Sequence, residues 1–206
     1  MKKVIIATML ASAALTGTAF ANAPAMDLAA GQGQFGYSYN NLKTDISAIG
    51  DLGTLHANNF QGAYALTDKL AVTGDYLNTE SQTFYSYKAG GYLRNLNINS
   101  TQLGLQYKLS HNLAVTAGNA KTELKANNNS VSTSEAFAGV AYKTALTNHV
   151  DGYASYSRSS NIEDWKTGLT YNVGSNLSVD AGYRHFETKD IGSKAEGMGF
   201  GVNYKF

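Results

Sequence analysis

The chain has 206 residues with 16 basic and 15 acidic side chains, so its net charge of +1 creates no field that would favour nucleic acid as a partner. It contains no cysteine, which excludes disulfides and thiolate ligands for a metal. Tyrosine occurs 14 times and glycine 21 times beside a single proline, and this composition favours strands over helices. We therefore expect an all-β protein without a bound cofactor.

The first 21 residues predict a secretory signal peptide. Lys2 and Lys3 precede an apolar stretch over residues 4–15, and small residues follow that stretch as far as Ala21. Hydroxyl side chains interrupt the apolar stretch, which is shorter than the ~20 residues that a spanning helix requires. We therefore expect cleavage after Ala21 and a single domain over residues 22–206.

A block in which tyrosine ends one strand and an aliphatic residue begins the next occurs four times. The first copy, YALTDKLAVTGDY, begins at Tyr64, and the others begin at Tyr107, Tyr142 and Tyr171. Each copy predicts two amphipathic strands joined by a tight polar turn. The predicted turns lie at residues 67–69, 110–112, 145–148 and 174–176.

Two further strands flank these four blocks, one near residues 32–40 and one over residues 195–206, so ten strands are predicted. Leu93, Leu96 and Ile98 are out of phase with the strand that follows them. A β-bulge and a long hairpin loop explain this shift equally well. An alternative with eight strands therefore stays open.

Alternation is clearest at the end of the chain, where apolar side chains from Met198 to Phe206 share one face and glycine or polar residues share the other. A soluble sandwich would bury the apolar face, whereas an outer-membrane barrel would turn it to lipid. The opposite faces of the strands carry six charged residues: Asp75, Lys108, Asp151, Lys166, Asp180 and Arg184. An unpaired ion costs several kcal/mol in a dry core, but a barrel lumen can pair or hydrate it. We therefore expect a transmembrane antiparallel up-and-down β-barrel, and disfavour the sandwich and a propeller.

The connections between strands also differ at the two ends of the predicted barrel. Short turns lie at the end that holds both termini, which is the periplasmic end in bacterial outer-membrane barrels. The longer connections are expected at the extracellular end, over residues 41–56, 80–97, 122–134, 159–164 and 188–194.

The signal peptide, the alternating hairpins and the ending GFGVNYKF resemble the small outer-membrane β-barrel superfamily, which includes opacity-type and porin-like surface proteins. The resemblance covers the whole mature chain and implies residence in the lipid of the bacterial outer membrane. In that superfamily, a terminal phenylalanine preceded by aromatic residues at alternate positions is recognised by the barrel-assembly machinery. This feature carries over to Phe206, Tyr204 and, less strictly, Phe200.

Few residues suggest catalysis or metal binding. His185 precedes Glu187, and a His–carboxylate pair can activate water, so a barrel-embedded hydrolase stays as a remote alternative. Barrel lipid A deacylases carry a serine where Glu187 stands here. Asp45, Asp51 and His56 have the irregular spacing of solvated side chains rather than of a cation site. We expect no enzyme activity and no metal site.

Two other functions use different parts of the predicted barrel. Extracellular loops can contact a host or another cell surface, and we favour this role. The alternative is a narrow porin-like channel for small polar solutes, whose selectivity the six lumen charges would set. An interior of ten strands is only slightly wider than one of eight, which side chains fill.

Overall fold

The computed structural model describes residues 23–46, 50–86, 91–126, 129–188 and 193–206. The strands are β1 (Gly33–Ile46), β2 (Gly50–Ala65), β3 (Leu70–Thr79), β4 (Gln82–Ser86), β5 (Gly91–Lys108), β6 (Leu113–Ala126), β7 (Asn129–Ala145), β8 (Val150–Arg158), β9 (Ile162–Asn172), β10 (Leu177–Thr188) and β11 (Ser193–Lys205). Within these described ranges, no helix is long and apolar enough to cross a membrane.

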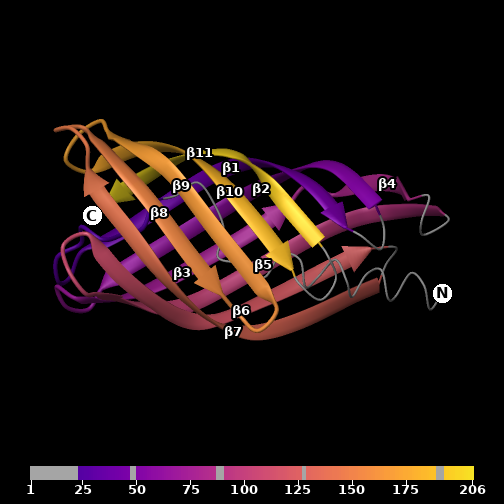
Figure 1. Ribbon diagram of the computed structural model, residues 1–206, viewed down its shortest axis with the longest axis horizontal. Helices are drawn as coiled ribbons and strands as arrows, with labels where there is room; N and C mark the ends of the chain where they lie inside the picture. Colours follow the sequence, from indigo (N-terminus) through magenta and orange to yellow (C-terminus); the bar gives the residue numbers. More distant parts are fainter. Residues whose placement is uncertain (1–22, 47–49, 87–90, 127–128, 189–192) are drawn as a thin grey trace.

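Ten of the strands close into an antiparallel barrel (Figure 1). Neighbours in the sequence pair with one another, except that β3 pairs directly with β5, and β1 pairs with β11 to complete the ring. β4 pairs only with the first part of β5 and forms a hairpin at the end of the barrel away from the C-terminus. The ten-stranded prediction is confirmed, so the eight-stranded alternative is excluded.

The repeated block forms the same hairpin at each of its four positions. The backbone N–H groups of Leu66, Leu109, Leu146 and Val173 donate to the carbonyls of Leu70, Leu113, Val150 and Leu177, at 2.8, 2.8, 2.8 and 2.9 Å. The third turn lies at residues 146–149, one residue later than the predicted 145–148. Ala145 stays in β7 because it pairs with Asp151 of β8, and His149 belongs to the turn instead.

The predicted extracellular loops are largely strand, which corrects the sequence analysis. β1 and β2 continue through most of residues 41–56, and β6 and β7 continue through most of residues 122–134. The connection predicted at residues 159–164 is shorter, because β9 begins at Ile162. Above the lipid both faces of a strand can meet water, so the alternation that marks a strand fades while backbone pairing continues. Part of the connection at residues 188–194 lies outside the described residues.

The β4–β5 pair contains a β-bulge, but this bulge does not account for the phase shift in the predicted fourth strand. Phe84 of β4 faces Leu93 of β5, whereas Gln82 faces Leu96, so β5 contains one extra residue between Leu93 and Leu96. From Asn97 to Lys108, β5 pairs with β6 without a register shift, so positions 98 and 103 alternate to opposite faces of one continuous strand. In the predicted loop over residues 80–97, residues 82–86 and 91–96 pair as antiparallel strands.

An apolar band surrounds the barrel. Outward side chains such as Leu103 and Phe200 are 65% and 62% exposed to the surroundings, and tyrosines lie at the periplasmic ends of several strands. The outward residues of β11 are apolar from Met198 to Phe206. A strand that rises ~3.3 Å per residue and tilts by ~40° crosses roughly 20 Å of bilayer over that stretch. This height suits the hydrocarbon layer, with aromatic rings at its edge.

Candidate functional site

The six charged residues predicted for the lumen lie on the inward side of the barrel wall, at two levels. Lys108 of β5 and Asp151 of β8 lie near the periplasmic end. The other four lie farther from that end: Asp75, Lys166, Asp180 and Arg184.

A buried ion pair spans β9 and β10 near their extracellular ends. The Arg184 Nε atom lies 2.6 Å from the Asp164 Oδ1 atom, and the two side chains are 5% and 2% exposed. Asp164 was assigned to a loop in the sequence analysis, so its role was missed. Nearer the start of β10, the Asp180 carboxylate accepts a hydrogen bond from the side-chain amide of Asn203 at 2.9 Å. Arg184 and Asp180 therefore bind to other side chains of the wall.

Tyr153 fills much of the lumen next to β9 and β10. Its side chain is buried, and the phenol packs against the backbone at Gly168 and Gly182. A Cβ atom at Gly168 would lie 2.5 Å from the phenol oxygen. These two glycines therefore make room for the Tyr153 ring, and they do not widen a passage.

Toward the extracellular side, inward residues of β1, β2 and β3 form an apolar layer. Leu42, Ala57 and Leu77 pack against one another with 2%, 0% and 0% exposure. Leu55 is buried as well. Buried polar side chains lie beside this layer, among them Asn59, Thr79 and Thr122. The side chains that fill this part of the lumen thus come from the wall itself.

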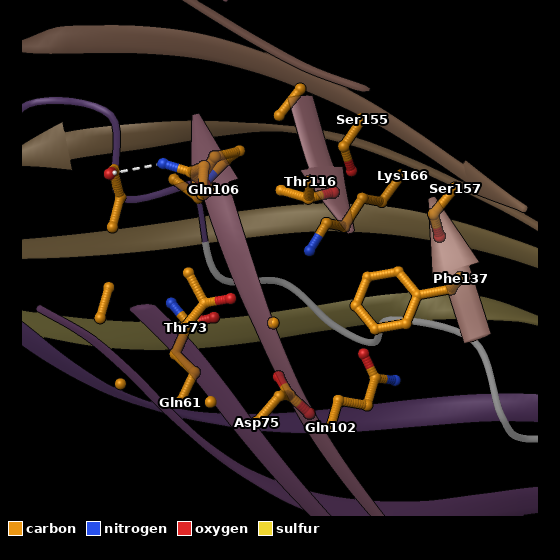
Figure 2. A pocket seen from close by; sticks show the side chains of 18 of the residues that line it. Gln61, Thr73, Asp75, Gln102, Gln106, Thr116, Phe137, Ser155, Ser157 and Lys166 are labelled. Carbon is orange, nitrogen blue, oxygen red and sulfur yellow. Dashed lines mark hydrogen bonds between the residues drawn. The ribbon is translucent and has the colours of Figure 1, made fainter. Parts of the chain in front are cut away.

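A cavity of about 120 Å³ lies below this layer. Asp75, Gln102 and Lys166 line it together with the ring of Phe137 (Figure 2). One water needs only ~10–15 Å³ of such space, so the cavity has room for several waters. Ala23, Pro24 and Ala25 form part of its lining, although they precede the first strand.

Residues 23–32, called here the plug segment, occupy the lumen at its periplasmic end. Ala23, Met26 and Leu28 are 3%, 2% and 2% exposed, and Met26 packs against Ala114 and Ala141 of the wall. Nothing in the sequence analysis anticipated this segment, since its small and polar residues show no strand periodicity.

Polar groups of the wall hold the plug segment in place. The Gln106 amide donates to the Ala25 carbonyl at 3.0 Å (Figure 2), and the Lys108 ammonium donates to the Leu28 carbonyl at 2.8 Å. The Asp27 carboxylate binds two further ammonium groups. Its Oδ2 atom lies 2.5 Å from Lys143 Nζ and 3.2 Å from Lys205 Nζ.

These ammonium groups also set the ionisation of Asp27. Burial alone would raise the pKa of Asp27, but Lys143 and Lys205 outweigh it and hold the pKa below its ordinary value of 3.8. Lys143 also contacts Asp151, at 3.3 Å. At neutral pH the plug segment is therefore bound through an ionised carboxylate.

The β4–β5 hairpin carries a pair of tyrosines far from the lipid band. Tyr85 and Tyr92 face each other across the two strands, with ring centroids 4.9 Å apart in an edge-on arrangement. Their side chains are 49% and 61% exposed. Exposed aromatic groups on a water-facing hairpin are typical of contact surfaces, where tyrosine often carries binding energy.

His185 lies on the outer face of the barrel wall rather than in the lumen. Its Nδ1 atom is 3.2 Å from a Glu196 carboxylate oxygen, which also accepts from the Tyr183 hydroxyl at 3.0 Å. The Nε2 atom is 3.9 Å from Glu187, and the ring stacks on Trp165 at 5.4 Å. The His185–Glu187 pair therefore sits against an aromatic surface at the edge of the lipid band, where no lumen cavity adjoins it.

The other candidates from the sequence are dispersed. His56 pairs with Asn41, with 2.5 Å between the Nδ1 and Oδ1 atoms, and it stacks on Tyr39. In the part of the chain that the structure describes, no three histidine or carboxylate side chains gather as a metal site. Phe200, Tyr204 and Phe206 of the proposed assembly signal point outward, at 62%, 51% and 66% exposure.

Comparisons with known proteins agree with this architecture. A family model described as "Outer membrane protein beta-barrel domain" matches residues 7–206. The outer membrane protease OmpT from Escherichia coli is similar in structure, with a TM-score of 0.54 at 9% identity over 88% of this chain and 100% of that one. Neisserial surface protein A gives a TM-score of 0.49 at 14% identity, over 85% of this chain and 99% of its own.

A third similar structure is Ail, the attachment invasion locus protein of Yersinia pestis, in complex with the heparin analogue sucrose octasulfate. It gives a TM-score of 0.46 at 14% identity, over 86% of this chain and 99% of its own. No curated protein sequence matches the chain. At such identities the likeness shows the fold alone. A fold alone does not decide between a catalytic and a non-catalytic role.

Proposed function

Because the chain belongs to the outer membrane protein beta-barrel domain family, which points to the bacterial outer membrane, we propose that it acts as a surface protein through its extracellular hairpins. The first 21 residues would direct export and then be removed. Phe200, Tyr204 and Phe206 would guide insertion by the barrel-assembly machinery. The role is contact with a host or another cell surface, without catalysis.

The exposed Tyr85–Tyr92 pair carries this proposal. Ring surface in water is unfavourable unless a partner covers it, and Tyr contributes strongly to protein contacts. The extracellular part of the lumen supports the same conclusion, because Leu42, Ala57 and Leu77 point into it and are almost fully buried there. Function is then expected on the hairpins that extend beyond the lipid.

The test replaces both tyrosines, as Tyr85→Ser with Tyr92→Ser, in barrels reconstituted in lipid nanodiscs. Binding to cultured host cells and to other bacterial cells should fall about tenfold or more, as expected for the loss of aromatic contact residues. Lys121→Ser is the matched control, since Lys121 is exposed on the outer face of β6. Undiminished binding of the double variant to every surface that the native barrel binds would contradict the proposal.

A narrow channel is the second candidate, and the cavity beside Asp75 and Lys166 is the observation that favours it. Planar-bilayer recording of the purified barrel decides between the two roles. Absence of current steps above background supports the surface role, whereas regular steps with the same conductance in each insertion would favour the channel.

A further inference from the structure

We propose that the periplasmic half of the lumen is a binding vestibule for small anions, such as carboxylate, sulfate or phosphate groups, and that the plug segment occupies it as an internal ligand. This inference concerns the opposite end of the molecule from the proposed surface role. It does not depend on what the extracellular hairpins bind.

The vestibule is positively charged. Lys108, Lys143 and Lys205 come from β5, β7 and β11, yet all three ammonium groups converge on the plug segment. Asp151 is the wall carboxylate that contacts one of them. These three ammonium groups and one carboxylate have a net charge of +2, which the plug segment partly compensates. Asp27 and the Leu28 carbonyl supply the acceptors.

The plug segment is attached to the strands of the wall at one end. Backbone-to-backbone hydrogen bonds join it to the wall only at the rim, where Gly31 donates to the Ala65 carbonyl at 2.8 Å and Ala65 donates to the Gln32 carbonyl at 2.9 Å. Asp68 accepts from the Ala30 backbone at 2.9 Å at the same rim. Beyond this point the segment is held by side chains of the wall, not by a strand ladder. It can therefore leave without opening the barrel.

Gly31 provides the bend between the wall and the lumen. Its φ angle is +82°, in the left-handed region that glycine adopts without strain. The chain thus turns sharply from β1 into the lumen at a residue suited to it. Rotation about this position is the simplest way for residues 23–30 to leave.

A cavity lies directly above the plug segment. Ala23, Pro24 and Ala25 form part of its lining, together with Gln106 and Lys166 of the wall. Departure of the segment would join this cavity to the vestibule. The combined space would open to the periplasm and end at the apolar layer of Leu42, Ala57 and Leu77. The structure therefore predicts a vestibule that binds anions from the periplasmic side.

The absence of native cysteine allows a direct test in the full chain. Ala141→Cys places a single thiol beneath Met26, at a position that is 5% exposed. With Asp27 intact, thiol reagents should react slowly there, and Asp27→Asn should raise the rate about tenfold or more by releasing the plug segment. Ser175→Cys, on the exposed last turn, is the control and should be unaffected by Asp27→Asn.

The charge of the reagent then tests the anion preference. In the Asp27→Asn background at low salt, an anionic methanethiosulfonate should react with Ala141→Cys about tenfold faster than a cationic one, after normalisation to the Ser175→Cys rates. Lys143→Gln with Lys205→Gln should also release the plug segment but remove this preference. Equal normalised rates for the two reagents in the Asp27→Asn chain, where all three lysines are intact, would overturn the vestibule.

Sulfate provides a test without substitution of any charged residue. In the chain that carries Ala141→Cys alone, sodium sulfate should accelerate reaction with an uncharged thiol reagent more than sodium chloride does at equal ionic strength. Equal acceleration by both salts reflects screening alone and would overturn the anion site. A rate for Ala141→Cys that is already as high as that for Ser175→Cys would overturn the docked plug segment. Heat-dependent mobility in detergent gels shows that each variant has folded.

Discussion

The two halves of the lumen are filled by different means. The extracellular half contains side chains of the strands themselves: the Arg184–Asp164 pair and the layer around Leu77. The periplasmic half is filled by a separate segment that pairs with the wall only at its rim. The first group of side chains belongs to the barrel wall, whereas the plug segment can leave without breaking any strand pairing of the wall. A ten-stranded interior can thus be filled by its own wall at one end and by a separate segment at the other.

The largest effect is expected from breaking the buried ion pair of the extracellular half. Arg184→Ala removes the guanidinium group that pairs with the buried Asp164 carboxylate, and we expect the free energy of unfolding to fall by about 3–5 kcal/mol. Urea unfolding in detergent micelles measures this change. Lys194→Ala is the control, because its pair with Glu196 is exposed to solvent and contributes little to stability. A loss below about 1 kcal/mol for Arg184→Ala would show that the barrel tolerates the loss of this ion pair.

A smaller effect tests the packing around Tyr153. Gly182→Ala forces a methyl group against the phenol oxygen and should cost about 1–3 kcal/mol of unfolding free energy. Tyr153→Phe removes that oxygen and should recover part of the loss, which a double-mutant cycle quantifies. Gly174→Ala, at an open turn position, is the control. Equal costs of Gly182→Ala in the Tyr153 and Phe backgrounds would argue against this contact.

The smallest effect concerns pH and the periplasmic half alone. The folded pKa of Asp27 lies below 3.8, so its contribution to docking is fully present above pH 3.8 and is lost as the pH falls through the lower, folded value. The charged groups around Asp27 are Lys143, Lys205 and, beside Lys143, Asp151. The NMR signal of the Met26 methyl group should therefore move from a docked to a free position on acidification, while unfolding of the barrel needs harsher conditions. In Asp27→Asn the signal should not titrate over this range.

Much of the barrel was predictable because lipid imposes a strict pattern on the strands that it surrounds. The copies at Tyr64, Tyr107, Tyr142 and Tyr171 alternate clearly, and they located the hairpins to within one residue. Where water surrounds the strands, as in residues 122–134, neither face is required to be apolar. The sequence pattern then resembles a loop although the backbone pairing continues.

The closures of the lumen were harder to predict, because they depend on contacts between distant residues. Leu42 lay in a predicted loop, and its contact with Ala57 and Leu77 requires the exact register of three strands. Asp27 and Lys143 are 116 positions apart, and no local pattern links them. Charge identity was readable from the sequence, but the choice of partner was not.

The seam between β1 and β11 has a consequence for assembly. The Gly33 and Phe206 backbones exchange two hydrogen bonds of 2.9 Å beside the pairing of β1 with β11. Until β11 pairs with β1, the folding barrel keeps two unpaired strand edges, which readily pair with other chains. Such contacts between segments far apart in the sequence form slowly, because a long loop must close first. The pairing of β1 with β11 is thus the step that removes the exposed edges of the barrel.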